Sequence, residues 1–115
     1  MTGMLEVAGL DELAPGATLR VEVDGTPVCL VNVGGTVHAL HDTCTHARAS
    51  MSEGFVDEGV IECPRHGAQF DVATGQALTP PATLPLPTFA VEVRDGRVLV
   101  DPTPSHAHPL DAKRR

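Results

Sequence analysis

Two short segments, each with one cysteine and one histidine, constrain this chain more than any other feature. They are Cys44-Thr45-His46 and Cys63-Pro64-Arg65-His66-Gly67, and sixteen residues separate them. Thiolate and imidazole groups are ligands of iron–sulfur clusters and of structural zinc. We therefore expect the fold to bring the two segments together around one metal centre.

The mixed composition of each segment bears on the kind of metal centre. Structural zinc sites usually pair cysteine with cysteine in one half of the site. Here each half offers one cysteine and one histidine. In a cluster of two irons and two sulfides (2Fe-2S), both cysteines can then reach one iron and both histidines the other. The pattern favours such a cluster, with zinc as the alternative.

Length and composition indicate one small soluble domain. The 115 residues are 42% hydrophobic, which suffices for one modest core. No apolar run approaches the ~20 residues of a membrane-spanning helix. The first ten residues lack the basic and apolar regions of a signal peptide. We therefore expect a cytoplasmic protein that does not bind a membrane.

Acidic side chains outnumber basic ones, and the formal net charge is -7. Such a charge disfavours nucleic acid as a partner and would speed encounter with a basic protein surface. Solubility alone also explains it. The same two interpretations apply to an acidic group around the second segment, which either steers a partner or is simply solvated: Glu53, Asp57, Glu58 and Glu62.

Short alternating segments between turn signals predict an all-β fold without a substantial helix. The expected strands are 4–8, 18–23, 28–33, 36–40, 60–62, 68–71, 90–94 and 97–100, and 55–57 is a short hairpin-like excursion. Dipeptides such as Asp24-Gly25 and Asp95-Gly96 predict tight hairpin turns. Segment 28–33 is largely apolar, so both of its faces should be covered. The core candidates of the last hairpin are Val91, Val93, Val98 and Val100.

Proline content marks two further segments. Four prolines between residues 80 and 87 predict a stiff crossing that cannot be a central strand. Three more lie between residues 102 and 109, where apolar periodicity is absent. We expect one folded domain at residues 1–100 and a flexible tail at residues 101–115.

The remaining cysteine and histidines are explained without metal binding. Three cysteines in a chain of this kind point to metal or redox chemistry rather than to disulfides. Cys29 lies in an apolar run, where a buried inert thiol is favoured over a ligand. His38 has the alternation of a strand-surface residue, and His41 lies outside the paired spacing. His106 and His108 form a His-x-His tract without a partner ligand.

With its surrounding residues the chain resembles the Rieske ferredoxins of bacterial aromatic-ring dioxygenase systems. The resemblance covers about residues 28–100 and lies in residues 42–46 and 62–67, Phe70-Asp71 and Thr74-Gly75. It implies stacked antiparallel sheets. Two loops would form a cluster-binding subdomain at about residues 41–83. It also implies one 2Fe-2S cluster of the Rieske type.

The resemblance assigns a role to each ligand. Cys44 and Cys63 would bind the buried iron, and His46 and His66 the exposed iron. The Pro80-Pro81 stretch would cover a third side of the cluster. Candidate donors to the sulfides are the backbone N–H groups of residues 47–49 and 65–68.

The resemblance also implies an electron carrier and not an enzyme. Such a protein takes one electron at a time from a flavin-containing NAD(P)H reductase and passes it to a terminal ring-hydroxylating oxygenase. We expect it to be a monomer. The alternatives are a small Rieske subunit of a larger reductase, such as nitrite reductase, and a zinc-stabilised interaction module. Retention of all four ligands disfavours a purely structural subunit.

Residues beside the ligands predict a low reduction potential. Rieske proteins of respiratory chains have a disulfide between the loops and two hydroxyl groups that bond to sulfur. The matching positions here are Ala49, Arg65, Ala68 and Phe70. Without those donors, and in an acidic body, the cluster is harder to reduce. We predict a midpoint toward the low end of the ~-150 to +300 mV range of Rieske centres.

Overall fold

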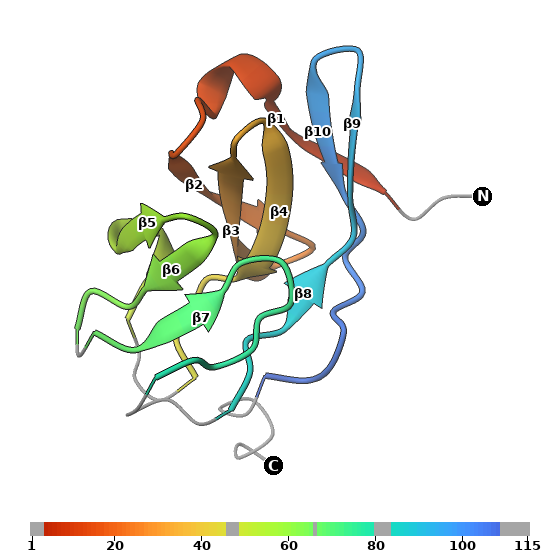
Figure 1. The fold of residues 1–115 in the computed structure, drawn as a ribbon. Helices are drawn as coiled ribbons and strands as arrows, with labels where there is room; N and C mark the ends of the chain where they lie inside the picture. The colour runs from red at the N-terminus through yellow and green to blue at the C-terminus, as the bar shows by residue number, and fades with distance from the viewer. Residues whose placement is uncertain (1–3, 46–48, 66, 80–83, 109–115) are drawn as a thin grey trace.

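Three antiparallel sheets make up the part of the chain that the computed structural model describes, which is residues 4–45, 49–65, 67–79 and 84–108 (Figure 1). Two short 3-10 helices accompany them. These elements confirm the predicted all-β class. Within the described ranges, no helix is long and apolar enough to cross a membrane.

The sheets contain ten strands in the described residues. The first sheet has the order β1 (Leu5–Gly9), β10 (Arg97–Val100) and β9 (Val91–Arg94). The second has the order β2 (Thr18–Val23), β3 (Thr26–Val33), β4 (Thr36–His41) and β8 (Thr88–Phe89). The third has the order β5 (Phe55–Asp57), β6 (Val60–Glu62) and β7 (Gln69–Asp71). The 3-10 helices are η1 (Leu10–Glu12) and η2 (Met51–Glu53).

The second sheet separates two hydrophobic cores, because successive side chains of a strand point to opposite faces. In β3, Cys29 and Val31 belong to the core shared with the β5–β6–β7 sheet. Val28 and Leu30 belong to the core shared with the β1–β10–β9 sheet. All four are fully buried, which confirms that both faces of this strand are covered. Figure 1 shows the β5–β6–β7 and β1–β10–β9 sheets on either side of this one.

Tight turns close the hairpins where the sequence predicts them. At Asp24-Gly25 and Asp95-Gly96 both residues have positive φ, a turn geometry whose twist matches that of the flanking strands. In the last hairpin Val98 and Val100 are buried, as predicted. The prediction for Val93 is wrong, since this residue is 43% exposed. It lies near the turn of an edge strand, beyond the part of β9 that packs on the core.

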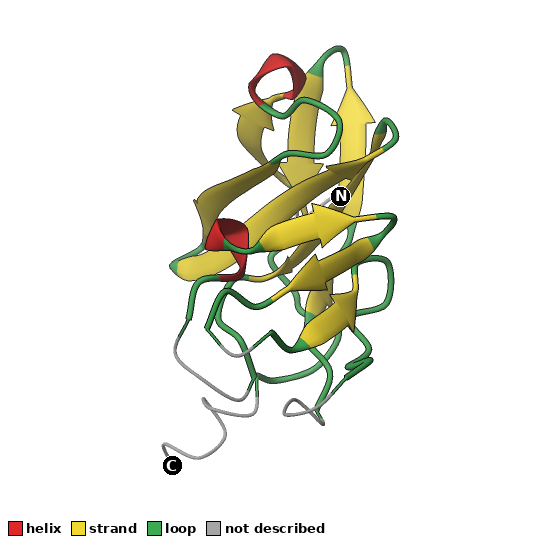
Figure 2. Ribbon diagram, turned by 60° about the vertical axis from the view of Figure 1, so that its left-hand side comes forward, coloured by secondary structure: helices red, strands yellow, loops and turns green. Residues whose placement is uncertain are grey.

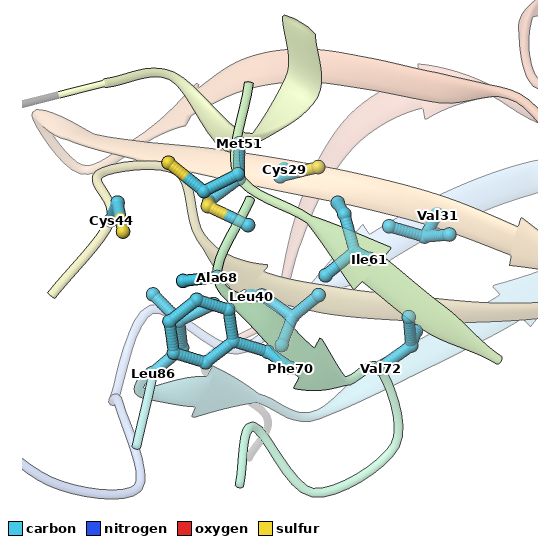
Figure 3. Packing of buried hydrophobic residues seen from close by; sticks show 11 residues of the cluster. Cys29, Val31, Leu40, Cys44, Met51, Ile61, Ala68, Phe70, Val72 and Leu86 are labelled. Atoms are coloured by element: carbon cyan, nitrogen blue, oxygen red, sulfur yellow. The ribbon is translucent and has the colours of Figure 1, made fainter. Parts of the chain in front are cut away.

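Figure 2 shows loops gathered at one end of the molecule, below the strands. Cys44 and Cys63 lie in loops next to strands β4, β6 and β7. The first segment follows β4, and the second connects β6 to β7. Beneath them is one of the two cores, whose large members include Met51, Ile61, Phe70 and Leu86. Figure 3 shows this core, with Cys44 at its edge. The end that carries the two cysteines therefore has its own hydrophobic support.

Residues 101–108 lie on the body of the protein after β10. Asp101 donates its backbone N–H to the carbonyl oxygen of Ala90 at 2.9 Å. Farther along, Ser105 and Thr88 exchange two hydrogen bonds, from the Ser105 N–H to the Thr88 carbonyl at 2.9 Å and from the Thr88 N–H to the Ser105 hydroxyl at 3.0 Å. The domain boundary at residue 100 and the flexible tail stay predictions, and residues 109–115 lie outside the described ranges.

Candidate metal centre

The two cysteines begin hairpin loops of the same length. The Cys44 N–H donates to the carbonyl oxygen of Ala49 at 3.0 Å. The Cys63 N–H donates to the carbonyl oxygen of Ala68 at 2.7 Å. In both loops the acceptor lies five residues after the cysteine. The same backbone hydrogen bond therefore closes both loops.

The residues that flank the loops are paired in the same way. Thr43, directly before the first cysteine, forms an antiparallel bridge with Ser50. Glu62, directly before the second cysteine, pairs with Gln69 in the ladder between β6 and β7. We call the two units the first ligand hairpin (residues 43–50) and the second ligand hairpin (residues 62–69). Each fixes its cysteine at the first position of its loop.

Both cysteines are buried in the same hydrophobic core. Cys44 is 0% exposed and Cys63 is 1% exposed. All three cysteines of the chain lie in the described residues, and none forms a disulfide. Two soft sulfur donors thus enter one apolar region from two hairpins. This donor set fits a metal centre with thiolate ligands, so Cys44 and Cys63 would hold the buried iron of a 2Fe-2S cluster.

The other two predicted ligands, His46 and His66, lie outside the described residues, and so do Pro80 and Pro81. The sequence places each histidine within the loop of its hairpin, two and three residues after the cysteine. The four-ligand set and the cover by the proline stretch therefore stay predictions. A described contact links the end of that stretch to the first hairpin, since the Thr45 hydroxyl donates to the Leu84 carbonyl at 2.9 Å.

The segment after the first hairpin lies directly against the second. Gly54 ends η2, and a Cβ atom placed on it would be 1.9 Å from the carbonyl oxygen of Glu62. No side chain fits at that position without a shift of the backbone. Glu62 is the residue before Cys63. Backbone contact at Gly54 therefore sets how close the two hairpins come to each other.

A buried carboxylate, which the sequence reasoning missed, stabilises the first hairpin. Asp42 is 2% exposed. Its Oδ2 accepts hydrogen bonds from the Ser50 hydroxyl at 2.6 Å and from Nε of Arg20 at 3.2 Å. Its Oδ1 accepts one from the Ser52 N–H at 2.9 Å. Asp42 thus connects the start of the hairpin to its end, and the pairing of residues 42 and 50 has no local signature in the sequence.

Cys29 has the properties of an inert thiol. Burial, and to a smaller degree the negative charge of Asp42, raise the pKa of the Cys29 thiol well above its usual range. A protonated thiol is a poor metal ligand, because the thiolate is the coordinating form. The structure therefore agrees with the predicted reading of Cys29.

Gly67 serves the turn of the second hairpin. Its φ is +75°, in the left-handed region that favours glycine. Its N–H donates to the carbonyl oxygen of Cys63 at 3.1 Å. This N–H is therefore engaged inside the hairpin.

Comparisons with known proteins agree with a cluster site. The family model of the Rieske [2Fe-2S] domain matches residues 3–90. Ferredoxin CarAc of Metapseudomonas resinovorans is 45% identical over 97 residues, which is 84% of this chain and 91% of that protein. The ferredoxin component of biphenyl 2,3-dioxygenase from Rhodococcus jostii is 43% identical over 98 residues, which is 85% of this chain and 92% of that protein.

A solved structure is similar over nearly the whole chain. It is the complex of reduced oxygenase and oxidized ferredoxin in carbazole 1,9a-dioxygenase, in which the matching chain is 41% identical with a TM-score of 0.86. The match covers 93% of this chain and 100% of the other. The predicted stacking of antiparallel sheets is therefore confirmed as a known fold.

Proposed function

Because the chain belongs to the Rieske [2Fe-2S] domain family, we propose that it is a one-electron carrier of a multicomponent oxygenase system. Like its ferredoxin relatives it carries one 2Fe-2S cluster and is an electron-transfer component, not an enzyme. The observation that supports the site most directly is the pair of matched hairpins, each with a buried cysteine at the start of its loop.

The proposed ligands are Cys44 and Cys63 on the buried iron and His46 and His66 on the exposed iron. The bound cluster supplies a couple that accepts and releases a single electron. The chain supplies the positions of the ligands. The backbone bonds of the hairpins orient the cysteines, and the apolar core beneath them excludes water from the thiolates. The predicted order of ligands leaves the histidine side as the side that a partner reaches.

The proposed partners are a flavin-containing NAD(P)H reductase as donor and a terminal ring-hydroxylating oxygenase as acceptor. The oxygenase is supported by the similarity to the ferredoxin of the carbazole 1,9a-dioxygenase complex. The reductase, a cytoplasmic location and a monomeric state follow from the resemblance in sequence and are part of the proposal. The relatives include ferredoxins of biphenyl 2,3-dioxygenase and of carbazole 1,9a-dioxygenase, which favours this function over a nitrite reductase subunit.

The acidic surface near the second hairpin supports a basic partner. A groove of the β5–β6–β7 sheet is lined by Asp57, Glu58 and Glu62 together with the exposed ring of Phe55. If these charges steer docking, the rate of reduction by the reductase should fall as salt rises, because salt screens exposed charges. Stopped-flow reduction over a salt series measures this. Rates that do not respond to salt would remove steering from the proposal.

The ligand set is tested by cysteine variants of the whole chain. We expect the wild-type protein and Cys29→Ser to bind iron and sulfide in equal amounts and to give the electron paramagnetic resonance spectrum of a histidine-ligated cluster after reduction. Cys44→Ser should lose the cluster, and His46→Ala should change the spectrum or lose the cluster. A colourless wild-type protein that binds zinc would contradict the proposal.

Reconstitution tests whether the protein carries electrons between a reductase and an oxygenase. The holoprotein is mixed with candidate reductases and oxygenases, and hydroxylated product is measured against NADH consumed. We expect product formation to depend on this protein. A holoprotein that is reduced by a nitrite reductase and by no oxygenase-system reductase would support the alternative function instead.

A further inference from the structure

His108 contacts the first ligand hairpin from the far end of the chain. The residue is 3% exposed, although it lies in a segment without secondary structure. Its Nε2 is 2.8 Å from the carbonyl oxygen of Thr43. A carbonyl oxygen can only accept, so Nε2 of His108 carries the proton and donates it. A buried imidazole is thus directed at the residue before Cys44.

This contact holds the peptide group that joins Thr43 to Cys44. Because a peptide group is planar, the Thr43 carbonyl and the Cys44 N–H turn together. His108 binds the carbonyl side of this plane, and the carbonyl of Ala49 binds the N–H side at 3.0 Å. The plane is therefore fixed from both edges. Its orientation sets the direction in which the Cys44 side chain leaves the backbone.

A second imidazole fixes the preceding peptide group. Nδ1 of His41 accepts a hydrogen bond from the Thr43 N–H at 3.1 Å. The rings of His41 and His108 pack against each other, with centroids 4.3 Å apart and planes tilted by 45°. Two histidines, one from β4 and one from the C-terminal segment, thus bind both backbone groups of Thr43.

The C-terminal segment carries His108 to this place through several anchors. Ser105 is bound to Thr88 by two hydrogen bonds, and the Asp101 N–H donates to the carbonyl oxygen of Ala90 at 2.9 Å. Figure 1 shows the segment as the blue trace that descends beside β8 toward the end with the ligand hairpins. His108 is therefore part of a segment with further contacts to the body and does not reach Thr43 as an isolated contact.

We infer that His108 is a positioning residue for the metal centre. Its N–H orients the peptide plane before Cys44 and so sets the geometry of the sulfur that binds the buried iron. This inference rests on the proposed ligand set. The second hairpin obtains the same support from strands β6 and β7, which pair on both sides of its loop. The first hairpin has one isolated bridge at Thr43 and backbone bonds from Cys44 to Ala49 and from Met51 to Asp42, and side chains add to this support.

The test compares three variants of the full chain. His108→Leu keeps the size of the side chain and removes the donor, and His108→Gln keeps an N–H donor. His106→Gln is the matched control, because it changes an exposed histidine of the same segment that contacts Pro85 instead of the hairpin. The readouts are the rate of cluster release to a chelator, the midpoint potential, and the iron–sulfur bands of the resonance Raman spectrum.

For His108→Leu we expect release about three to ten times faster, the factor that one hydrogen bond accounts for. The potential and the Raman bands should shift as well. His108→Gln should restore all three readouts toward the wild-type values, and His106→Gln should leave them unchanged. A change in thermal stability alone would mean a structural role and would contradict the inference.

Two results separate this inference from the proposed function. A wild-type protein without a cluster refutes the function, and with it the inference. A loaded His108→Leu protein that matches the wild type in all readouts refutes the inference alone. If His108→Leu does not fold, the His108→Gln data and the ¹⁵N shifts of the His108 ring decide the question. A proton on Nδ1 rather than on Nε2 would overturn the inference.

Discussion

The two ligand hairpins have the same backbone pattern and different supports. The second hairpin is the end of a β-ladder, in which Glu62 pairs with Gln69 and Ile61 with Phe70. The first hairpin has a single bridge between Thr43 and Ser50. Backbone bonds from Cys44 to Ala49 and from Met51 to Asp42 add to this bridge, and side chains, above all the carboxylate of Asp42, supply the rest. One geometry is thus held by a β-ladder in one case and by fewer backbone bonds together with buried polar side chains in the other.

The difference in support determines how sensitive each hairpin is to substitution. A ladder of backbone hydrogen bonds survives most substitutions, because every residue except proline carries the same donor and acceptor. A buried polar network depends on particular side chains, and the loss of one member leaves its partners unsatisfied. The first hairpin should therefore be the more sensitive of the two. The predictions below test this, from the largest expected effect to the smallest.

Gly54→Ala should have the largest effect, because it acts on the contact between the hairpins. Its Cβ would meet the Glu62 carbonyl at 1.9 Å, so the backbone must move. We expect a loss of stability of more than about 3 kcal/mol, the upper range for overpacking, and little cluster loading. Iron content and a circular dichroism melt measure both.

The control is Gly59→Ala, in the turn between β5 and β6. Its Cβ would meet nothing within 4 Å, but its φ of +80° strains any other residue. This strain costs about 1–2 kcal/mol, and the hairpins should still meet. If both variants load the cluster equally well, Gly54 does not set the distance between the hairpins.

Asp42→Asn and Glu62→Gln form a matched pair, one on each hairpin. Asp42 is buried with three hydrogen bonds to its carboxylate, so its change should cost about 1–3 kcal/mol and speed cluster release. Glu62 is partly exposed, and its side chain bonds to Gln69 at 3.2 Å. Its change should stay within about 0.5 kcal/mol. Equal effects on the rate of cluster release would show that the two hairpins do not differ in sensitivity.

The difference between backbone support and side-chain support also explains which features the sequence could predict. Strand alternation and turn dipeptides are local signals, so the β3 strand and the hairpin turns were predicted correctly. The spacing of Cys44 and Cys63 likewise indicated two similar loops. The side-chain network was not predictable, because Asp42 and Ser52 are ten residues apart and His108 is 65 residues from Thr43. Such contacts form only when the chain is folded, and no hydrophobic periodicity in the sequence predicts them.

The smallest expected effect concerns the reduction potential, and Ala49 and Ala68 allow a direct comparison. Both lie five residues after their cysteine, and neither side chain carries a hydroxyl group. Ala68 is fully buried, whereas Ala49 is partly exposed. A serine hydroxyl at position 68 would be buried and could donate a hydrogen bond to a sulfur of the metal centre. Such a donor favours the reduced, more negative state of the cluster. A serine at position 49 can bond to water instead.

Ala68→Ser should therefore raise the midpoint by about 40 mV, which corresponds to about 1 kcal/mol in a one-electron couple. Ala49→Ser should raise it by less than half of that value. Protein-film voltammetry of the two variants and the wild type decides the matter. Equal shifts would mean that the two loops present the same surroundings to the cluster, and that their difference is confined to the supports outside the loops. A wild-type midpoint in the upper half of the Rieske range would refute the underlying premise, that the missing hydroxyls and the acidic body make reduction harder.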